Sequence, residues 1–555
     1  MAFATGRRSV LMLLMTPVLA FCYGGMARAS TKRVISALPS GGRAENSVWT
    51  YRGRWDPVFE LPNVAIHTSV LPNGKVLFWG RRDQPTGSMH DHECTPYVWD
   101  PRTGELTPTP QPQRVDGTKV NLFCSGHAYL PDGRLLVAGG HITDGDGLDQ
   151  ACVYDYRSNT WTALPVMNER RWYPTATALS DGTVLVSSGS YKDNGRVIIN
   201  DVPQIWDGHQ WTPTADFVGL PLYPRMHVAP SGQVFISGSN ASNAKAHIDG
   251  HGSRTAPPRT APPWIALPWP KGARQNGDRH YGPSVMYDVG KVIYIGGGND
   301  GATDLPTAAA EVIDLCANPP TWAEIASMHF PRRQHNATIL ADGSVLVTGG
   351  TGGPGFNDLS PGKPVHVAEL WDPVLNEWTK LAAEDVDRCY HGTAVLLPDA
   401  TVLSAGGGEF TVGGEQNDPR YSHRNAQIFH PPYLFRGPRP EIVSAPEEIA
   451  YGETFSLETS GPDVGKITWI RLPSVTHASD HNQRINVLNF CCADGRLNVA
   501  APERPETCPP GHYMLFVLSK AGVPSLARIV RIGPPAVHRQ VRPSGVGISR
   551  VINIA

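Results

Sequence analysis

The stretch G-H-A-Y-L-P-D-G-R-L-L-V-A-G-G, residues 126–140, carries the pattern that decides the fold. Two apolar segments flank an Asp-Gly pair, and a Gly-Gly pair follows the second segment. Asp-Gly supplies the positive φ that a tight β-hairpin turn needs, and paired glycines let a strand approach its neighbours closely. The stretch therefore predicts a β-hairpin that ends at a crowded place in the fold.

The same unit occurs seven times, with copies about 50–60 residues apart. Between copies, an aromatic-Asp pair is followed by a Trp, which indicates two further, outer strands. Sheets of this size cannot bury both faces alone, but a closed ring of them can. We therefore predict an all-β fold with a seven-bladed kelch-type β-propeller. The copies are 67–80, 126–140, 175–189, 226–238, 284–298, 336–350 and 388–408, and the outer-strand signals include Tyr154-Asp155 with Trp161, Trp206-Asp207 with Trp211, and Trp371-Asp372 with Trp378.

The remaining segments complete this architecture. Val48–Leu61 has outer-strand character without an inner pair, and we expect it to complete the last blade of a propeller that spans residues 30–433. Short alternating strands in 434–533 predict an immunoglobulin-like β-sandwich. Ala241–Asp278 lacks periodicity and is expected to be a functional loop, and 534–555 a loose tail.

The amino terminus is typical of an export signal. Arg7-Arg8 precede an apolar run too short to span a bilayer, and Ala27-Arg28-Ala29 forms a cleavage site. We expect residues 1–29 to be a signal peptide, with twin arginines that fit the twin-arginine route, and a secreted or periplasmic, monomeric protein. The net charge of −2 favours no nucleic-acid partner.

Eight cysteines remain after the signal peptide, and an exported protein is expected to form disulfides. Cys508 lies across an expected hairpin from the vicinal pair Cys491-Cys492, and we expect it to bond one of the two. The pairing of the other cysteines stays open; they are Cys94, Cys124, Cys152, Cys316 and Cys389.

A second regularity concerns the residues at the start of the inner strands. Cys124, Tyr173 and His391 each lie nine residues before the turn residue of their repeat, and Tyr390 lies ten before it. Adjacent residues in a strand point to opposite faces, so Tyr390 and His391 can serve one metal only at a strand mouth where the backbone bends. Imidazole and phenolate together suit Cu(II).

A structural explanation for such residues also exists. Aromatic and His side chains at strand entrances of a propeller can simply fill the central tunnel, as His67, His227 and His335 would. The segment Met89–Cys94, with two His at H-x-H spacing, is a weaker candidate for a second copper or zinc site. The group of Cys, Tyr and His at one height is what favours a redox metal site.

The chain resembles the copper-radical oxidases, galactose oxidase and glyoxal oxidase, from about Val48 to Gly533. The resemblance is carried by L-F-C-S-G-H (122–127), R-R-W-Y-P-T (170–175), R-C-Y-H (388–391), S-V-T-H-A-S-D-H-N-Q-R-I (474–485) and G-H-Y-M-L-F-V-L with G-V-P-S (511–525). It implies one copper ion held by Tyr173, Tyr390, His391 and His477. It also implies a radical cofactor in which a thioether joins Cys124 to Tyr173.

The resemblance further implies a reaction. Hydrated aldehydes or primary alcohols would be oxidised by O2 to carboxylic acids or aldehydes with release of H2O2, and Tyr390 would accept the substrate proton. Galactose oxidase has a stacking Trp where this chain has Tyr191, and a sugar-binding Arg where it has Pro224, with Arg225 one place later. We therefore expect a glyoxal oxidase-like enzyme.

Two alternatives remain open at this stage. His481 is a rival to His477 as the second histidine ligand. Fold alone also permits a non-catalytic kelch propeller that binds an extracellular glycan or a protein.

Overall fold

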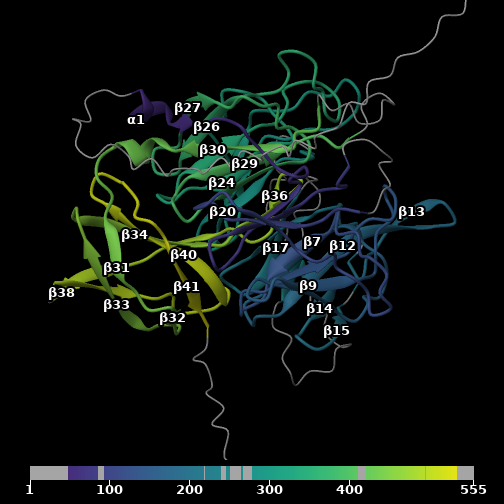
Figure 1. Ribbon diagram of the computed structural model, residues 1–555, viewed down its shortest axis with the longest axis horizontal. Helices are drawn as coiled ribbons and strands as arrows, with labels where there is room; N and C mark the ends of the chain where they lie inside the picture. The colour runs from purple at the N-terminus through teal and green to yellow at the C-terminus, as the bar shows by residue number, and fades with distance from the viewer. Residues whose placement is uncertain are drawn as a thin grey trace, which may run out of the picture.

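The computed structural model describes residues 48–84, 93–214, 216–217, 219–238, 278–410, 421–493 and 495–533, and the backbone of 246–249 and 264–266. The expected signal peptide, the tail and the two histidines of Met89–Cys94 lie outside these residues. The described part is nearly all β, as expected, and its ribbon divides into a larger body of sheets and a smaller group of carboxyl-terminal strands beside it (Figure 1). Within the described ranges, no helix is long and apolar enough to cross a membrane.

The larger body is a ring, a propeller of antiparallel sheets that each contain a run of four strands. In chain order these runs are β3 (His67–Val70), β4 (Val76–Trp79), β5 (Tyr97–Trp99), β6 (Leu106–Pro108); β7 (Gly126–Tyr129), β8 (Leu135–Ala138), β9 (Ala151–Asp155), β10 (Thr160–Ala163); β11 (Trp172–Ala178), β12 (Val184–Asp193), β14 (Gln204–Trp206), β15 (Trp211–Pro213), with β13 (Arg196–Ile199) on β12; β16 (Arg225–Val228), β17 (Gln233–Gly238), β18 (Ala246–Asp249), β19 (Trp264–Ala266); β20 (Ser284–Asp288), β21 (Lys291–Ile295), β22 (Ala310–Asp314), β23 (Trp322–Ile325); and β24 (Asn336–Ile339), β25 (Val345–Thr348), β26 (Val367–Asp372), β27 (Glu377–Ala383).

The last sheet of the ring contains strands from both ends of the propeller. Three of its strands come from the carboxyl-terminal end of the propeller: β28 (Gly392–Leu396), β29 (Val402–Gly406) and β30 (Asn425–His430). From the amino-terminal end, β1 (Arg54–Trp55) and β2 (Phe59–Glu60) both pair with β30. The expectation for Val48–Leu61 is therefore confirmed. This pairing fastens the ring, and the short helix α1 (Trp49–Arg52) precedes it.

Local sequence chemistry explains the sheets. Each repeat forms an inner hairpin, and the glycine of its turn has positive φ, as at Gly133 with φ 87°. The aromatic signals lie opposite one another on the outer strands, where Trp371 pairs with Trp378 and Trp206 with Trp211. Cross-strand aromatic pairs of this kind stabilise a sheet and cover its outer face.

The carboxyl-terminal strands form two sheets that pack on each other. One has the order β31 (Glu441–Ser444), β33 (Thr454–Ser460), β39 (Arg496–Ala500), β38 (Phe490–Ala493); the other has the order β32 (Glu448–Ile449), β41 (Arg528–Ile532), β40 (Gly511–Ser519), β34 (Val464–Arg471), β37 (Ile485–Val487). Buried Phe455, Trp469 and Leu515 lie in the core between them. The expected sandwich is confirmed, and the 3-10 turn η3 (Pro432–Phe435) precedes it.

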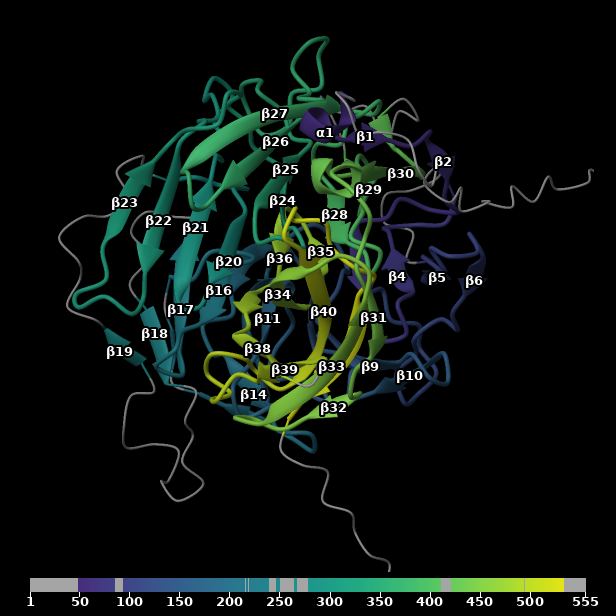
Figure 2. The same cartoon turned by 90° about the vertical axis from the view of Figure 1, so that its left-hand side faces the viewer.

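One hairpin of this carboxyl-terminal part belongs to the propeller. Strands β35 (Ser474–Thr476) and β36 (Ser479–Asp480) extend the first propeller sheet inward, and His67 of β3 pairs with Thr476. Figure 2 shows these strands over the middle of the ring. The sequence had not predicted these strands, and they bring residue 477 to the ring axis.

Two sequence-based expectations are wrong. Ala241–Asp278 is not wholly a loop, because β18 and β19 lie within it and pair as the outer strands of their sheet, while its other residues up to 277 lie outside the described ranges. Cys508 is free and buried in the sandwich core, whereas Cys491 and Cys492 are free and exposed. The disulfide is absent because β38, which carries the vicinal pair, forms its hairpin with β39 rather than with the segment around Cys508.

Candidate active site

The entrances of the inner strands share an unusual backbone conformation. Non-glycine residues with φ between 46° and 68° stand at corresponding places in six repeats, each nine residues before the turn residue. A residue in the left-handed backbone conformation bends the chain. Its side chain then need not follow the alternation of a regular strand and can face the end of the ring axis. These residues are Cys124, Tyr173, Tyr223, Tyr281, Gln334 and His391.

Sequence reasoning found only half of this set. It selected Cys124, Tyr173 and His391 by their spacing, and it missed Tyr223, Tyr281 and Gln334, although the same nine-residue rule applies to all of them. Tyr223 stacks on Tyr173 with ring centroids 4.4 Å apart. The spacing alone would therefore have identified the missing members.

Tyr390 and His391 show what the bend achieves. The two residues immediately precede β28, and His391 has φ 68°. Their rings lie on the same side of the chain and stack, with centroids 3.7 Å apart and planes 27° apart. Two neighbouring residues that a regular strand would send to opposite faces can thus act at one place.

The five residues singled out in the sequence come together at this end of the axis. The hydroxyls of Tyr173 and Tyr390 form a hydrogen bond. The ring centroid of His477 lies 4.6 Å from that of Tyr173 and 4.6 Å from that of His391. Cys124 packs in the same buried cluster as Tyr173, and its carbonyl accepts a hydrogen bond from the Tyr173 amide at 3.0 Å.

The two histidines present unpartnered nitrogens. His391 Nδ1 donates to the Gly408 carbonyl at 2.6 Å, and His477 Nδ1 bonds Thr476 Oγ1 at 2.6 Å. The Nε2 atoms of both rings are buried and have no hydrogen-bond partner in the described residues. A histidine whose Nδ1 is fixed in this way and whose Nε2 is open has the form of a metal ligand.

Burial favours the neutral forms of these groups. It lowers the pKa of His391 to about 3 and the pKa of His477 well below its usual value, so both imidazoles are neutral. It raises the pKa values of Tyr173 and Tyr390 well above the usual range, so both phenols keep their protons. A bound dication reverses the second effect, because it stabilises phenolate.

The donor set fits copper. Across the described ranges, no group of three or more His, Cys, Asp or Glu side chains is placed to hold a metal ion, and at this site two phenol oxygens lie beside the two histidines. Two neutral imidazoles and two phenols in one place are nitrogen and oxygen ligands of the kind that Cu(II) binds.

His481 directly follows β36 and packs against His127. Its ring stacks on His127, with centroids 5.1 Å apart, and its Nδ1 accepts a hydrogen bond from the His127 amide at 3.4 Å. His477, by contrast, contacts Tyr173, Tyr390 and His391. The geometry therefore favours His477 over its rival.

Trp172 is a further residue of the site that the sequence analysis did not select. Its ring stacks on Tyr173 with centroids 3.6 Å apart and planes 9° apart, and its indole N–H donates to His141 at 3.2 Å. The indole thus covers one face of the candidate radical ring. The sequence signal that could have identified Trp172 is its position directly before Tyr173.

Arg225 does not take the place of a sugar-binding arginine. Its guanidinium is buried and donates to the carbonyls of Tyr223, Gly282 and His477, at 2.8, 3.3 and 3.2 Å. All of its described hydrogen bonds are therefore made inside the protein. Half-buried rings of Tyr281, Phe356 and Phe410 surround Tyr390 instead.

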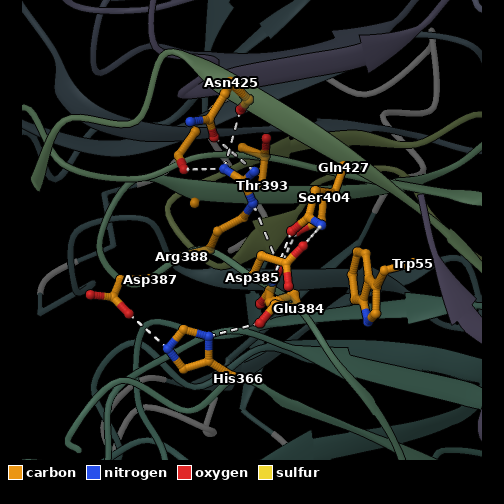
Figure 3. Close-up of polar contacts among 12 residues, drawn as sticks. Trp55, His366, Glu384, Asp385, Asp387, Arg388, Thr393, Ser404, Asn425 and Gln427 are labelled. Carbon is orange, nitrogen blue, oxygen red and sulfur yellow. Dashed lines mark hydrogen bonds and ion pairs between the residues drawn. The ribbon is translucent and has the colours of Figure 1, made fainter. Parts of the chain in front are cut away.

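A cluster of polar contacts surrounds Arg388, which lies two residues before Tyr390 in the chain (Figure 3). Arg388 donates to the Gly406 carbonyl at 2.8 Å and to Asn425 Oδ1 at 3.0 Å. Its Nε lies 3.6 Å from a carboxylate oxygen of Glu384, which accepts a hydrogen bond from Ser404. Arg388 is thus fixed to β29 and β30 directly before the site residues begin.

Comparisons with known proteins find similarity to galactose oxidases and aldehyde oxidases. The family model "Galactose oxidase-like, Early set domain" matches residues 439–532. A galactose oxidase from Gibberella zeae is 29% identical over 86% of this chain and 70% of its own length. The aldehyde oxidase GLOX of Vitis pseudoreticulata is 28% identical over 87% and 97%. A fungal alcohol oxidase solved in complex with copper shares the fold, with a TM-score of 0.70, 24% identity, and coverage of 86% of this chain and 99% of that one.

Proposed function

The chain belongs to the family of copper-radical oxidases, and from that premise we propose that it is a secreted enzyme that oxidises small aldehydes, as their hydrates, or primary alcohols with O2. The products are carboxylic acids or aldehydes together with H2O2. Glyoxal oxidase-like activity on aldehydes is the form we favour over galactose oxidation.

One observation carries the proposal. The Nε2 atoms of His391 and His477 are buried without hydrogen-bond partners in the described residues. They lie next to the phenols of Tyr173 and Tyr390, whose hydroxyls are hydrogen-bonded to each other. Buried polar atoms without partners cost free energy, and a metal ion at this place would remove that cost. We propose His391, His477, Tyr173 and Tyr390 as the ligands of a single copper ion.

Copper supplies a one-electron redox couple and stabilises phenolate, and the protein supplies the rest. Oxidation of an alcohol or hydrate removes two electrons, so a second one-electron site is needed, and we assign it to Tyr173 linked to Cys124. Tyr390 Oη receives the substrate proton as phenolate. Trp172 covers the Tyr173 ring, and the rings of Phe356 and Phe410 limit access of water to Tyr390.

The substrate assignment follows from the residues around these rings. An arginine that grips vicinal hydroxyls must present its donors to the ligand, but those of Arg225 bond main-chain carbonyls. The rings that stack on Tyr173 come from Trp172 and Tyr223, whereas Tyr191 lies on the β12–β13 hairpin beneath the guanidinium of Arg170. These features support small aldehydes such as glyoxal and methylglyoxal rather than a sugar.

The test is peroxide release by the copper-loaded full chain. Glyoxal, methylglyoxal, a primary alcohol and galactose are compared at matched concentrations. Tyr390→Phe is expected to abolish turnover, and Tyr154→Phe, which alters a buried tyrosine on outer strand β9, is expected to retain it. Stoichiometric copper with no peroxide from any substrate, or no copper binding, would favour a glycan-binding or protein-binding propeller instead.

A further inference from the structure

A line of buried hydrogen bonds connects Cys124 with the β35–β36 hairpin. The Cys124 amide donates to His67 Nε2 at 3.1 Å, and His67 Nδ1 bonds His127 Nε2 at 3.2 Å. His127 Nδ1 bonds Ser474 Oγ, which in turn lies 2.7 Å from Ser69 Oγ. All of these side chains are buried. The line therefore links the candidate thioether cysteine to the strand that leads to His477.

The chemistry of the donors fixes the direction of the line. A backbone amide can only donate, so His67 Nε2 must be the bare acceptor and Nδ1 must carry the proton. By the same reasoning, His127 accepts at Nε2 and donates from Nδ1 to Ser474. Burial lowers the pKa values of both histidines well below their usual range, so both rings are neutral. Each ring has one tautomer that satisfies both of its neighbours.

His67 is positioned on two sides. Its ring stacks on Trp79 with centroids 4.8 Å apart and planes 7° apart, so its plane is fixed. Its backbone lies opposite Thr476 in the pairing of β3 with β35. One residue therefore contacts both the segment that holds Cys124 and the segment that holds His477.

Cys124 needs such a partner. It has φ 64°, a conformation that costs a non-glycine residue free energy and persists only where the surroundings hold it. The His67 acceptor satisfies its buried amide in that conformation, and Cys124 lies in the same buried cluster as Tyr173 at the next strand entrance. An apolar residue at position 67 would leave the amide unsatisfied.

We propose that His67 and His127 are positioning residues for cofactor assembly, which hold Cys124 in place for its bond to Tyr173. The inference rests on the proposed function. The bond joins Cys124 Sγ to the Tyr173 ring with loss of the thiol hydrogen and one ring hydrogen. The two electrons and two protons pass to dioxygen, which becomes hydrogen peroxide.

The experiment follows formation of this bond in the full chain. Copper-free protein is mixed with copper and O2, and the linked peptide is quantified against time by mass spectrometry. His67→Leu is expected to slow linkage about 10-fold or more, because it leaves a buried amide unpaired. His67→Gln keeps an acceptor and a donor and is expected to restore most of the rate. His227→Leu, at another buried histidine on an inner strand, is the matched control.

The outcomes separate this inference from the proposed function. Linkage in His67→Leu at the wild-type rate, or equal slowing in His67→Leu and His227→Leu, overturns the positioning role and leaves the function standing. No linkage in the wild type overturns both. Thermal unfolding of each variant is measured alongside. Should His67→Leu not fold, His127→Leu and the ring nitrogen resonances of the wild type decide, and an Nε2-protonated tautomer at either histidine contradicts the inference.

Discussion

Replacement of Glu384 by Gln tests the buried polar cluster of Glu384, Arg388 and Ser404, which lies close in the chain to the Tyr390-His391 segment. The carboxylate is fully buried, and burial raises its pKa from 4.5 to about 7 despite the nearby guanidinium of Arg388. The separation of 3.6 Å is long for a hydrogen bond, and both Glu384 Oε1 and Arg388 Nε have no hydrogen-bond partner in the described residues. The pair is therefore weak, and the protein favours the neutral carboxyl.

The sign and size of the effect follow from this difference in pKa. A carboxyl group that holds its proton more tightly in the folded state stabilises the fold fully below about pH 4.5, and this contribution is lost as the pH rises through about 7. The difference between the two pKa values corresponds to about 3 kcal/mol, and most of it falls between about pH 5 and about pH 8.5. Gln resembles the neutral carboxyl and does not titrate.

The assay is urea unfolding of the wild type and Glu384→Gln across that pH range. The variant is expected to gain about 2–3 kcal/mol relative to the wild type on going from about pH 5 to about pH 8.5. Glu377→Gln, at an exposed position of β27, controls for the substitution itself. A loss of about 3–5 kcal/mol at neutral pH, as expected for one partner removed from a sound buried ion pair, would refute the reasoning, and so would a difference that does not change with pH.

Four further predictions concern the site. After exposure to copper and O2, the peptides of Cys124 and Tyr173 should be found joined and lighter by two hydrogens; separate, unmodified peptides in active enzyme would contradict this. His477→Ala should lose copper on dialysis while His481→Ala retains it, as metal analysis can show, and the opposite result would reassign the ligand. Trp172→Ala should shorten the lifetime of the radical absorption at least several-fold, because the indole covers the Tyr173 ring; an unchanged lifetime would remove that role. Glyoxal and methylglyoxal should release peroxide faster than galactose, and the reverse order would overturn the substrate assignment but not the copper site.

Much of the fold could be predicted because its signals are local. An Asp-Gly or Asn-Gly pair between two apolar segments specifies a hairpin wherever it occurs, and outer-strand pairs such as Trp371 with Trp378 lie close in the chain. Part of the site was predictable for the same reason, since the nine-residue spacing places Cys124 and His391 at equal heights. The expected bond of Cys508 failed because nearness in sequence did not specify which strands would pair.

The sequence by itself determined the repeated hairpins, the residue types at the strand entrances and the order of the motifs, because each depends on residues a few positions apart. Only the tertiary structure decided that β35 pairs with β3, that His67 accepts a hydrogen bond from the Cys124 amide, and that Arg225 donates a hydrogen bond to the His477 carbonyl. These contacts join segments far apart in the chain, whose choice of partner depends on how the ring closes and which buried polar groups remain to be satisfied. No local pattern encodes that competition, so His67 could be taken for a residue that fills the tunnel until its neighbours were in place.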